Sequence, residues 1–334
     1  MPKCGSQIVL CDIPIRFDTY KGCTHGCKYC FVTRKVDISA PEPDETAASL
    51  ARFIDGHRTR ETQWCDWPIP LHWGGVSDPF QPCERKHRVS RDALRVFADT
   101  GHPVVVSTKG ALIGEPEYLD LIGRCNAVVQ FSLCSPQYDR LEPGAPPFEE
   151  RLRIAARVAQ VATRVIVRVQ PYTREIRRDL IAQIPRYAAA GIHGIVVEGL
   201  KAFRRLPGMV KLGADYVYPS SLLEQDFRQI RHAAHEAGLR FYSGENRLRA
   251  MGDHLCCCGI DGLPGFRGNT ANLNHYVHDP EGFAFTPCME SAPAEPFRAM
   301  RQDSHFSALL RKHSFAEVMR RYVADPEKRK TLLP

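Results

Sequence analysis

Three cysteines within eight residues constrain this chain more than any other feature of its sequence. Cys23, Cys27 and Cys30 are spaced C-x-x-x-C-x-x-C. Thiolates are the soft ligands of iron–sulfur clusters, and most electron-transfer clusters take four of them. A cubane held by three thiolates keeps one iron open for another ligand. Gly22 and Gly26 allow the positive φ angles that a tight wrap around a cluster requires, so the sequence predicts a cluster-binding loop.

The same loop resembles that of the radical SAM superfamily, in which an aromatic residue stands beside the last cysteine, as Tyr29 does here. The resemblance implies a [4Fe-4S] cluster on the three cysteines and S-adenosylmethionine (SAM) on the open iron. It also implies that one electron from the cluster splits the sulfonium and releases a 5′-deoxyadenosyl radical. A reducing partner of the flavodoxin or ferredoxin kind would supply that electron. The alternatives are three unrelated core thiols or a zinc knuckle, which favours two pairs of ligands.

Composition places the chain among folded soluble proteins, because 43% of its 334 residues are hydrophobic and 25% are charged. No apolar run approaches the length of a membrane span, and the N-terminus lacks the apolar core of a secretory signal. Thirteen cysteines without such a signal predict a reducing, cytoplasmic environment. The net charge of +7 is compatible with an anionic substrate such as a nucleic acid, although basic proteins of this size are common.

Apolar, β-branched runs alternate with helical segments along residues 69–245. Such runs are typical of strands buried on both faces of a parallel sheet, and the alternation indicates an α/β fold, either a barrel or a doubly wound sheet. With one strand before the cluster loop, the count approaches the partial (β/α)6 TIM-like barrel that radical SAM enzymes share. We expect strands at 69–73, 104–108, 127–133, 165–169, 195–198 and 239–242, and helices at 42–60, 90–100, 117–123, 148–161, 178–190 (broken near Pro185) and 222–237.

These patterns divide the chain into three regions. They are an N-terminal segment over 1–22, the partial barrel over 23–245, and a C-terminal extension over 246–334 with a cysteine-rich loop and a helical tail. The tail has many basic residues and an apolar stripe, which together favour a solvated amphipathic helix. The stripe consists of Phe306, Leu309, Leu310 and Phe315.

In folds of this class, functional groups collect at the carboxyl ends of the strands. Gly74 and Gly75 follow the second strand, where the family places a glycine-rich motif whose backbone receives the SAM amino group. The alternative is an ordinary turn between a strand and a helix. This chain departs from the family at the acidic position of that motif, so Ser77 and Asp78 are the candidates for the polar contact with SAM.

Three further segments resemble the spore photoproduct lyase-like branch of the superfamily, and they occur in the same order. They are the D-P-F-Q-P run at 78–82, Ser107-Thr108-Lys109, and the E-P-G and E-R-L sequences at 142–144 and 150–152. The resemblance covers about residues 12–200 and implies hydrogen abstraction from a nucleic-acid or nucleotide-like substrate, as in DNA repair. Two alternatives remain open: modification of a peptide or small metabolite, and a non-catalytic iron–sulfur electron carrier or nucleic-acid binder.

Three more residues at strand ends are candidates for the site. Lys109 and Ser132 lie where the resemblance places a ribose or carboxylate contact with SAM, which a hydroxyl or an ammonium group can make. The alternative for each is a side chain that meets only solvent or a neighbour. Cys134 ends the fourth strand and is a candidate hydrogen-atom donor to a product radical, or else a small buried hydrophobe.

Three adjacent thiols stand in the C-terminal extension, and a fourth follows them: Cys256, Cys257, Cys258 and Cys288. Neighbouring side chains of an extended segment project to opposite sides, so the three share a metal only if the loop turns. The interpretations are an auxiliary iron–sulfur cluster or zinc site, with Cys4 or Cys11 as a further ligand, redox or hydrogen-donor thiols, or a plain cysteine-rich turn. We expect this loop to cover the mouth of the barrel and to carry metal or substrate contacts.

Overall fold

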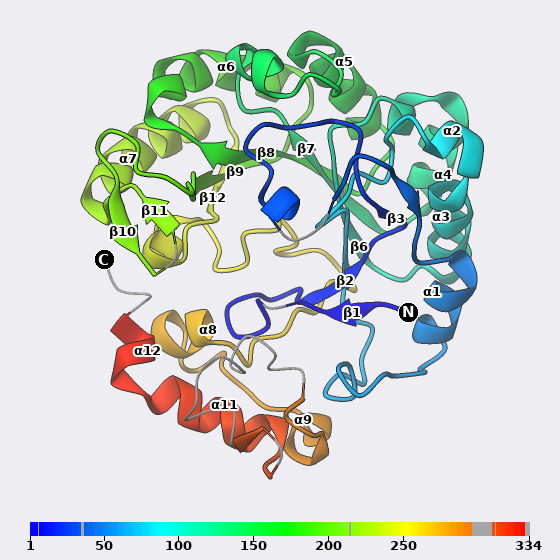
Figure 1. The fold of residues 1–334 in the computed structure, drawn as a ribbon, viewed down its shortest axis with the longest axis vertical. Coiled ribbons are helices and arrows are strands. Elements are labelled where there is room, and N and C mark those ends of the chain that lie inside the picture. The colour runs from blue at the N-terminus through cyan, green and yellow to red at the C-terminus, as the bar shows by residue number, and fades with distance from the viewer. Residues whose placement is uncertain (6, 35–36, 214, 296–308, 311, 331–334) are drawn as a thin grey trace.

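The structure is a computed structural model that describes residues 1–334 except 6, 35–36, 214, 296–308, 311 and 331–334. Its centre is an eight-stranded sheet that curves into an open barrel (Figure 1). Neighbouring strands are parallel, except for β1 with β2. The strands, in spatial order, are β1 (Lys3–Cys4), β2 (Ile15–Phe17), β5 (Leu71–Trp73), β6 (Val104–Thr108), β7 (Ala127–Ser132), β8 (Arg164–Tyr172), β9 (Gly194–Gly199) and β12 (Arg240–Ser243).

Helices follow the parallel strands and cover the outside of the barrel (Figure 1). The long ones are α1 (Ala47–Ile54), α3 (Val89–Thr100), α4 (Pro116–Arg124), α5 (Phe148–Ala159), α6 (Arg177–Ala189) and α7 (Ser220–Glu236), and the short α2 (Glu84–His87) precedes α3. Six strand–helix units therefore run from β2 to α7, and β12 adds a further parallel strand. The predicted partial (β/α)6 barrel is confirmed.

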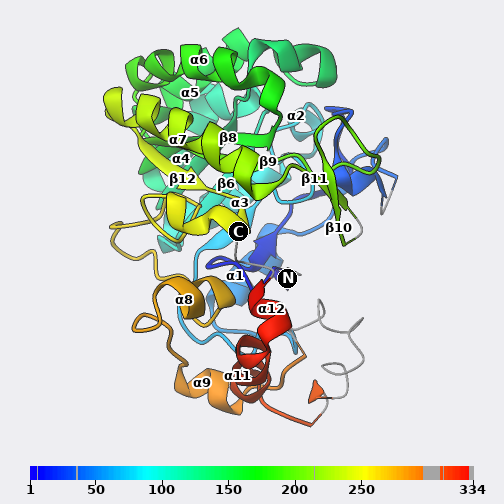
Figure 2. The same ribbon diagram turned by 90° about the vertical axis from the view of Figure 1, so that its left-hand side faces the viewer.

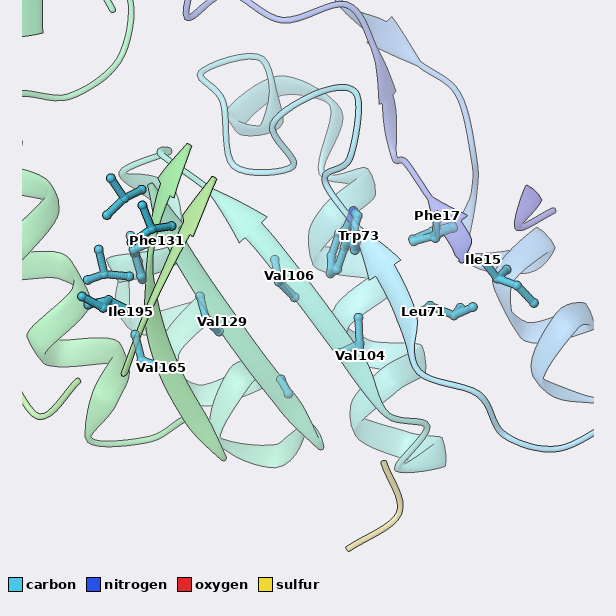
Figure 3. Packing of buried hydrophobic residues seen from close by; sticks show 14 of the residues in the cluster. Ile15, Phe17, Leu71, Trp73, Val104, Val106, Val129, Phe131, Val165 and Ile195 are labelled. Atoms are coloured by element: carbon cyan, nitrogen blue, oxygen red, sulfur yellow. The ribbon is translucent and has the colours of Figure 1, made fainter. Parts of the chain in front are cut away.

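The main core lies between the sheet and these helices. Alternate strand residues such as Val104, Val106 and Val129 point outward into it and are fully buried, as Figure 3 shows. Their neighbours Val105 and Val128 point to the interior of the barrel and belong to a separate apolar cluster. Because successive side chains of a strand face opposite sides, each strand contributes both to the core and to the interior wall.

The predicted break in the fifth long outer helix is wrong. α6 runs without interruption through Pro185. Proline lacks an N–H, so the helix loses one backbone hydrogen bond there. Leu180, Ile184 and Tyr187 are nevertheless fully buried on its inner face, and this packing outweighs the lost bond.

The later part of the C-terminal extension is a group of short helices on the side of the barrel where β1 and β2 lie (Figures 1 and 2). They are α8 (Leu273–His278), α9 (Pro287–Ser291), α11 (Phe315–Ala324) and α12 (Pro326–Lys330). The expectation of a solvated tail helix is wrong, because Phe315 is buried and its ring stacks on Trp64 with centroids 5.3 Å apart. Phe306 of the predicted stripe lies outside the described residues. No helix in the described ranges is both long and apolar enough to cross a membrane.

Candidate active site

The cluster loop lies beyond the carboxyl end of β2. It follows β3 (Tyr20–Lys21), which pairs with β4 (Glu42–Pro43) outside the main sheet. Cys23, Cys27 and Cys30 are free and partly exposed. Gly22 and Gly26 adopt φ angles of 89° and 59°, as the wrapped loop requires.

The donor set of this loop fits a [4Fe-4S] cluster. Among the residues that the structure describes, no three His, Cys, Asp or Glu side chains are placed to hold a single metal ion. A cubane instead takes each thiolate on a different iron and so needs more widely separated sulfurs. A surface pocket of about 420 Å³ lies beside Cys23 and Cys27. Burial raises the pKa of Cys23 to about 12 and also raises that of Cys27, so iron binding there would release protons.

Gln81, from the D-P-F-Q-P run, fastens the start of the cluster loop. Its Oε1 accepts a hydrogen bond from the backbone N–H of Thr24 at 3.0 Å, and its Nε2 donates to the carbonyl of Gly22 at 3.1 Å. The Gln81 side chain is fully buried. The loop backbone on both sides of Cys23 is therefore held by one amide group.

Asp78 belongs to the same D-P-F-Q-P run, and its buried carboxylate contacts both the segment after β6 and the cluster loop. Its carboxylate accepts hydrogen bonds from the backbone N–H groups of Phe80 at 2.9 Å and Lys109 at 2.6 Å, and from the Thr108 hydroxyl at 2.8 Å. It also lies 3.1 Å from Nε2 of His25. Burial alone would raise the pKa of Asp78, but His25 and the N–H donors lower it to about 2. These internal partners hold the carboxylate in place, and the contact of Asp78 with SAM stays a prediction.

The E-P-G segment clamps the other side of the loop. The N–H of Gly144 donates to the carbonyl of His25 at 2.9 Å, and Nδ1 of His25 donates to the carbonyl of Gly144 at 3.0 Å. A Cβ at Gly144 would lie 2.2 Å from the carbonyl oxygen of Thr24, so this close approach requires glycine. The backbone N–H of Lys28 donates to Leu141 at 2.9 Å.

Glu142 connects the loop to the barrel, a role that the sequence reasoning missed. Its buried carboxylate accepts a hydrogen bond from the Tyr29 hydroxyl, lies 2.7 Å from Nη1 of Arg151, and lies 3.8 Å from Nζ of Lys109. The Lys109 ammonium stands 5.8 Å from the centre of the Tyr29 ring. Tyr29 and Lys109, both predicted site residues, therefore meet at Glu142. Its position as the first residue of the E-P-G motif is the sequence feature that could have revealed this role.

The remaining candidates for SAM contacts lie at the same end of the barrel. Gly74 has a φ of 87°, and a Cβ there would lie 2.3 Å from the carbonyl oxygen of Ser107, whereas Gly75 has neither restriction. Ser77 is buried and donates to the carbonyl of Tyr20 at 2.6 Å. Ser132 is buried at the end of β7. Their contacts with SAM stay predictions.

A layer of polar side chains crosses the barrel interior below these residues. Nη1 of Arg168 donates to the Ser107 hydroxyl at 2.9 Å, and its Nε donates to Oε1 of Gln170 at 2.5 Å. Gln170 in turn donates to Glu198 at 2.5 Å, which pairs with Lys201 at 2.7 Å. The predicted convergence of polar groups from successive strand ends is therefore observed.

Cys134 lies in the main core, where its thiol is 4.0 Å from the carbonyl oxygen of Arg168, and it is 2% exposed. Burial, reinforced by the Glu142 carboxylate, raises the pKa of its thiol to about 12. The group therefore keeps its S–H bond at neutral pH, as a hydrogen-atom donor must. Its role in catalysis stays a prediction.

The cysteine-rich loop does not cover the mouth of the barrel, and that expectation is wrong. Cys256 and Cys258 pack with Val105 and Val128, and Cys257 packs against Ile166 in a second cluster. Each of these partners lies in the first half of its strand, facing inward. Nη1 of Arg164, the first residue of β8, donates to the carbonyl of Gly259 at 2.7 Å. The loop therefore fills the floor of the barrel, because its apolar side chains complete the lower interior wall.

The structure changes the predicted grouping of the thiols. Cys256 and Cys258 lie in one apolar cluster, and Cys11 and Cys257 pack against it. Cys288 is not brought to this group, and its thiol instead donates to the carbonyl of Gln63 at 2.9 Å. The neighbouring Cys258 thiol and the positive charge of Arg249 lower the pKa of Cys257. The predicted second metal site stays untested.

Comparison with known proteins identifies the class of protein. A model of the radical SAM superfamily matches residues 18–184. The chain belongs to the radical SAM superfamily. Membership makes it an enzyme and implies a [4Fe-4S] cluster and SAM as its cofactors.

Two solved structures of spore photoproduct lyase variants are similar to this chain. One, with bound AdoMet and dinucleoside spore photoproduct, has a TM-score of 0.55 and 16% identity over 69% of this chain and 76% of that chain. The other has a TM-score of 0.54 and 17% identity with the same coverage. At this level of identity the likeness concerns the fold.

Curated relatives include uncharacterized proteins of Mycobacterium bovis (strain ATCC BAA-935 / AF2122/97) and Mycobacterium tuberculosis (strain ATCC 25618 / H37Rv). Each is 27% identical to this chain over 206 residues. The match covers 56% of this chain and 59% of each relative. The chain thus spans less than two thirds of the length of these relatives.

Proposed function

We propose that the protein is a radical SAM enzyme of the spore photoproduct lyase-like branch that abstracts hydrogen from a nucleic-acid or nucleotide-like substrate. The observation that carries this proposal is the double clamp on the cluster loop. The D-P-F-Q-P and E-P-G segments, which resemble that branch, are the segments that hold the loop through Gln81 and Gly144. The fold shared with a lyase structure that contains a dinucleoside photoproduct supports the substrate class.

The residues of the chain position and shield the chemistry. When bound, the [4Fe-4S] cluster and SAM supply the 5′-deoxyadenosyl radical. Cys23, Cys27 and Cys30 are the ligands in this proposal. Lys109, 14% exposed at its side chain, places a positive charge beside Cys27, which offsets thiolate charge in a poorly hydrated site. Gly74 brings the backbone close to the ligand, and the walls of the barrel exclude water.

A basic segment at the mouth of the barrel favours an anionic substrate. It follows β9 and contains the hairpin of β10 (Val210–Leu212) and β11 (Asp215–Val217). Figure 2 shows the hairpin on the same side of the molecule as the N-terminal segment that carries the cluster loop. Its exposed residues include Phe203, Arg204, Arg205 and Lys211. Cations interleaved with an exposed aromatic ring are typical of surfaces that bind single-stranded nucleic acid.

Two further parts of the proposal concern electrons and hydrogen atoms. Phe31, directly after the last cluster cysteine, is 52% exposed, and Lys28 is exposed nearby. This surface suits a small acidic electron donor of the flavodoxin or ferredoxin kind. Cys134 is proposed as the hydrogen-atom donor to the product radical. A Cys134→Ala variant should then cleave SAM at the normal rate but change the product.

The decisive experiment follows deuterium from substrate into 5′-deoxyadenosine. The reconstituted, reduced protein is incubated with SAM and deuterated oligonucleotides, with deuterated peptides in a parallel arm. The proposal expects deuterium transfer from the oligonucleotide, and none from a variant in which Cys23, Cys27 and Cys30 are all alanine. Transfer only from the peptide would assign the enzyme to peptide modification. If the triple variant still forms 5′-deoxyadenosine, the assignment of the cluster loop is wrong.

A further inference from the structure

Two arginine side chains face the interior of the barrel from opposite parts of its wall. Arg16 lies on β2 and Arg168 on β8, and the residues on either side of each belong to the main core. Because successive side chains of a strand face opposite sides of the sheet, both arginines lie on the inner side. Both are only half-buried, although the cysteine-rich loop fills the floor beneath them. Their exposed surface therefore faces the part of the interior that opens toward the mouth.

Arg168 is held in place by neutral groups. Its Nη1 donates to the Ser107 hydroxyl at 2.9 Å and to Oε1 of Gln130 at 3.1 Å, and its Nε donates to Gln170 at 2.5 Å. Arg168 forms no ion pair with any carboxylate that the structure describes. The Glu198 carboxylate accepts a hydrogen bond from Gln170 instead, and its other oxygen pairs with a lysine. Arg168 is thus fixed in orientation while its charge has no direct partner among the described residues.

The charge of Arg16 is also only partly compensated. Its Nη1 lies 3.8 Å from Oδ2 of Asp18, which is longer than a hydrogen bond. The other oxygen of Asp18 accepts a hydrogen bond from the backbone N–H of Val76 at 3.2 Å. The buried Nε of Arg16 has no hydrogen-bond partner in the described part of the chain. Arg16 therefore adds positive charge to the interior wall without a close ion pair.

His72 and Gly75 connect the two arginines. A Cβ at Gly75 would lie 3.4 Å from Cδ of Arg16 and 3.7 Å from Nδ1 of His72, so both side chains border this glycine. Nε2 of His72 lies 3.0 Å from the Ser107 hydroxyl, which Arg168 also contacts. Burial, together with the positive charges of Arg168 and Arg16, lowers the pKa of His72 to about 3. The imidazole is therefore neutral, and it lies where the charges of both arginines act.

An excess of poorly hydrated positive charge favours an anionic ligand, because a buried charge is costly unless it is paired. The planar guanidinium group is well suited to the oxygens of phosphates and carboxylates. The polar layer lies directly on the floor, since Gln130 donates to the carbonyl of Cys258 at 3.3 Å. Gln130 also precedes Ser132, a predicted SAM contact, by two residues of β7, or about 7 Å along a strand. A ligand seated on this layer therefore lies deeper in the barrel than that contact.

We propose that Arg168 and Arg16 form an anion subsite inside the barrel, which receives a phosphate group of the substrate. The identity of the anion as a phosphate rests on the nucleotide-like substrate proposed above, whereas the subsite itself rests on the two arginines and their neutral partners. A substrate bound in this way enters with its phosphate first, so its reactive carbon lies between the polar layer and the cluster loop. This orientation favours a nucleotide that carries a terminal phosphate.

The first test locates an oxyanion in the unmutated protein. Crystals of the reconstituted protein are grown with SAM and selenate, whose selenium is found by its anomalous scattering. The proposal expects selenate beside the guanidinium of Arg168 while SAM is bound. Because SAM is present, its own carboxylate is not the group that fills the subsite. This measurement does not depend on whether any variant folds.

The second test measures the affinity for inorganic phosphate in solution. The SAM-bound protein is unfolded by heat at increasing phosphate concentration, with chloride added to keep the ionic strength constant. Arg168→Gln should weaken phosphate binding by about tenfold or more, because a hydrogen-bonded charge is lost, and Arg168→Lys should weaken it less because the charge is kept. Arg228→Gln is the control: it removes the same charge from a side chain of α7 that is 73% exposed, and it should leave the affinity unchanged.

Three results would overturn the proposal. They are the absence of selenate at Arg168, selenate that binds there only when SAM is absent, and a phosphate affinity that Arg168→Gln does not change. The second result would assign the arginine to the carboxylate of SAM. Selenate binding without deuterium transfer from oligonucleotides would support the subsite and refute the nucleotide, so the two proposals fail separately.

Discussion

Glu142 offers the sharpest test of the structure, because it holds the cluster loop to the barrel through buried charges. Its carboxylate is 2% exposed and lies 2.7 Å from the guanidinium of Arg151, which is 1% exposed. Replacing Glu142 by alanine leaves this guanidinium and the Lys109 ammonium without their shared anion. It also removes the hydrogen-bond acceptor of Tyr29, which stands between two cluster cysteines.

The expected cost follows from the partners that remain. Breaking a buried ion pair by removing one partner typically costs about 3–5 kcal/mol. Arg151 keeps the Ser132 carbonyl at 2.8 Å and Asp139 at 3.1 Å, so we expect about 3 kcal/mol, the lower end of that range. With an unfolding entropy of about 2.1 cal/mol/K per residue over 334 residues, this corresponds to a fall in Tm of about 4 °C.

The assay is urea unfolding of Glu142→Ala, Glu142→Gln and a matched control, Glu149→Ala. Glu149 also pairs with an arginine, Arg186, at 2.6 Å, but its side chain is 60% exposed. We expect the control to lose at most about 1 kcal/mol and to retain iron normally after reconstitution. Glu142→Gln keeps the side-chain shape but not the charge and should still lose stability. A loss for Glu142→Ala no larger than that of the control would refute the buried clamp.

Three further predictions concern other parts of the molecule. Gly74→Ala should lose about 1–3 kcal/mol or more because of its φ of 87°, whereas urea unfolding of Gly75→Ala should show a much smaller loss. Joint replacement of Arg204, Arg205 and Lys211 by alanine should lower the slope of log Kd against log salt for single-stranded DNA by about 2 if each contacts a phosphate; an unchanged slope would remove the mouth segment from the interface. Burial raises the pKa of Asp18 from 3.8 to about 6, despite the nearby Arg16, so the folded state binds the extra proton. Its contribution to stability is therefore present below about pH 4 and lost as the pH rises through about 6, and Asp18→Asn should flatten the dependence of the urea midpoint on pH in this interval.

The strand pattern of the barrel was readable from the sequence, because each strand combines β-branched residues with burial on both faces. The strand expected at 104–108 is β6 (Val104–Thr108) itself, and the one expected at 127–133 ends one residue earlier, at Ser132. Such periodic signals are local. The break expected near Pro185 failed because tertiary packing, which no local signal contains, decided whether the helix continued.

The sequence predicted which residues lie near the cluster loop better than it predicted the contacts they make there. The cluster motif placed Tyr29 in the loop, and the order of strand ends, together with the family resemblance, placed Ser77, Asp78 and Lys109 near it. The partners of Asp78 depend on how the loop folds over it, and its spacing in the sequence does not reveal that its oxygens are occupied by N–H groups. Gln81 was visible only as part of a motif, because its two hydrogen bonds reach residues far away in the sequence.

The position of the cysteine-rich loop changes how the interior of the barrel is used. With Cys256 and Cys258 packed against Val105 and Val128, the lower end of the interior is filled by apolar side chains. The polar layer around Arg168 lies directly above, since Gln130, which also bonds to Arg168, donates to the carbonyl of Cys258 at 3.3 Å. A substrate must then approach from the carboxyl ends of the strands, between the cluster loop and the basic segment after β9. The proposed nucleic-acid substrate would then present a single nucleotide turned out of its stack, as substrates of enzymes that act on one base do. The filled floor and the basic mouth thus favour substrates whose reactive unit is small and whose flanking groups are anionic.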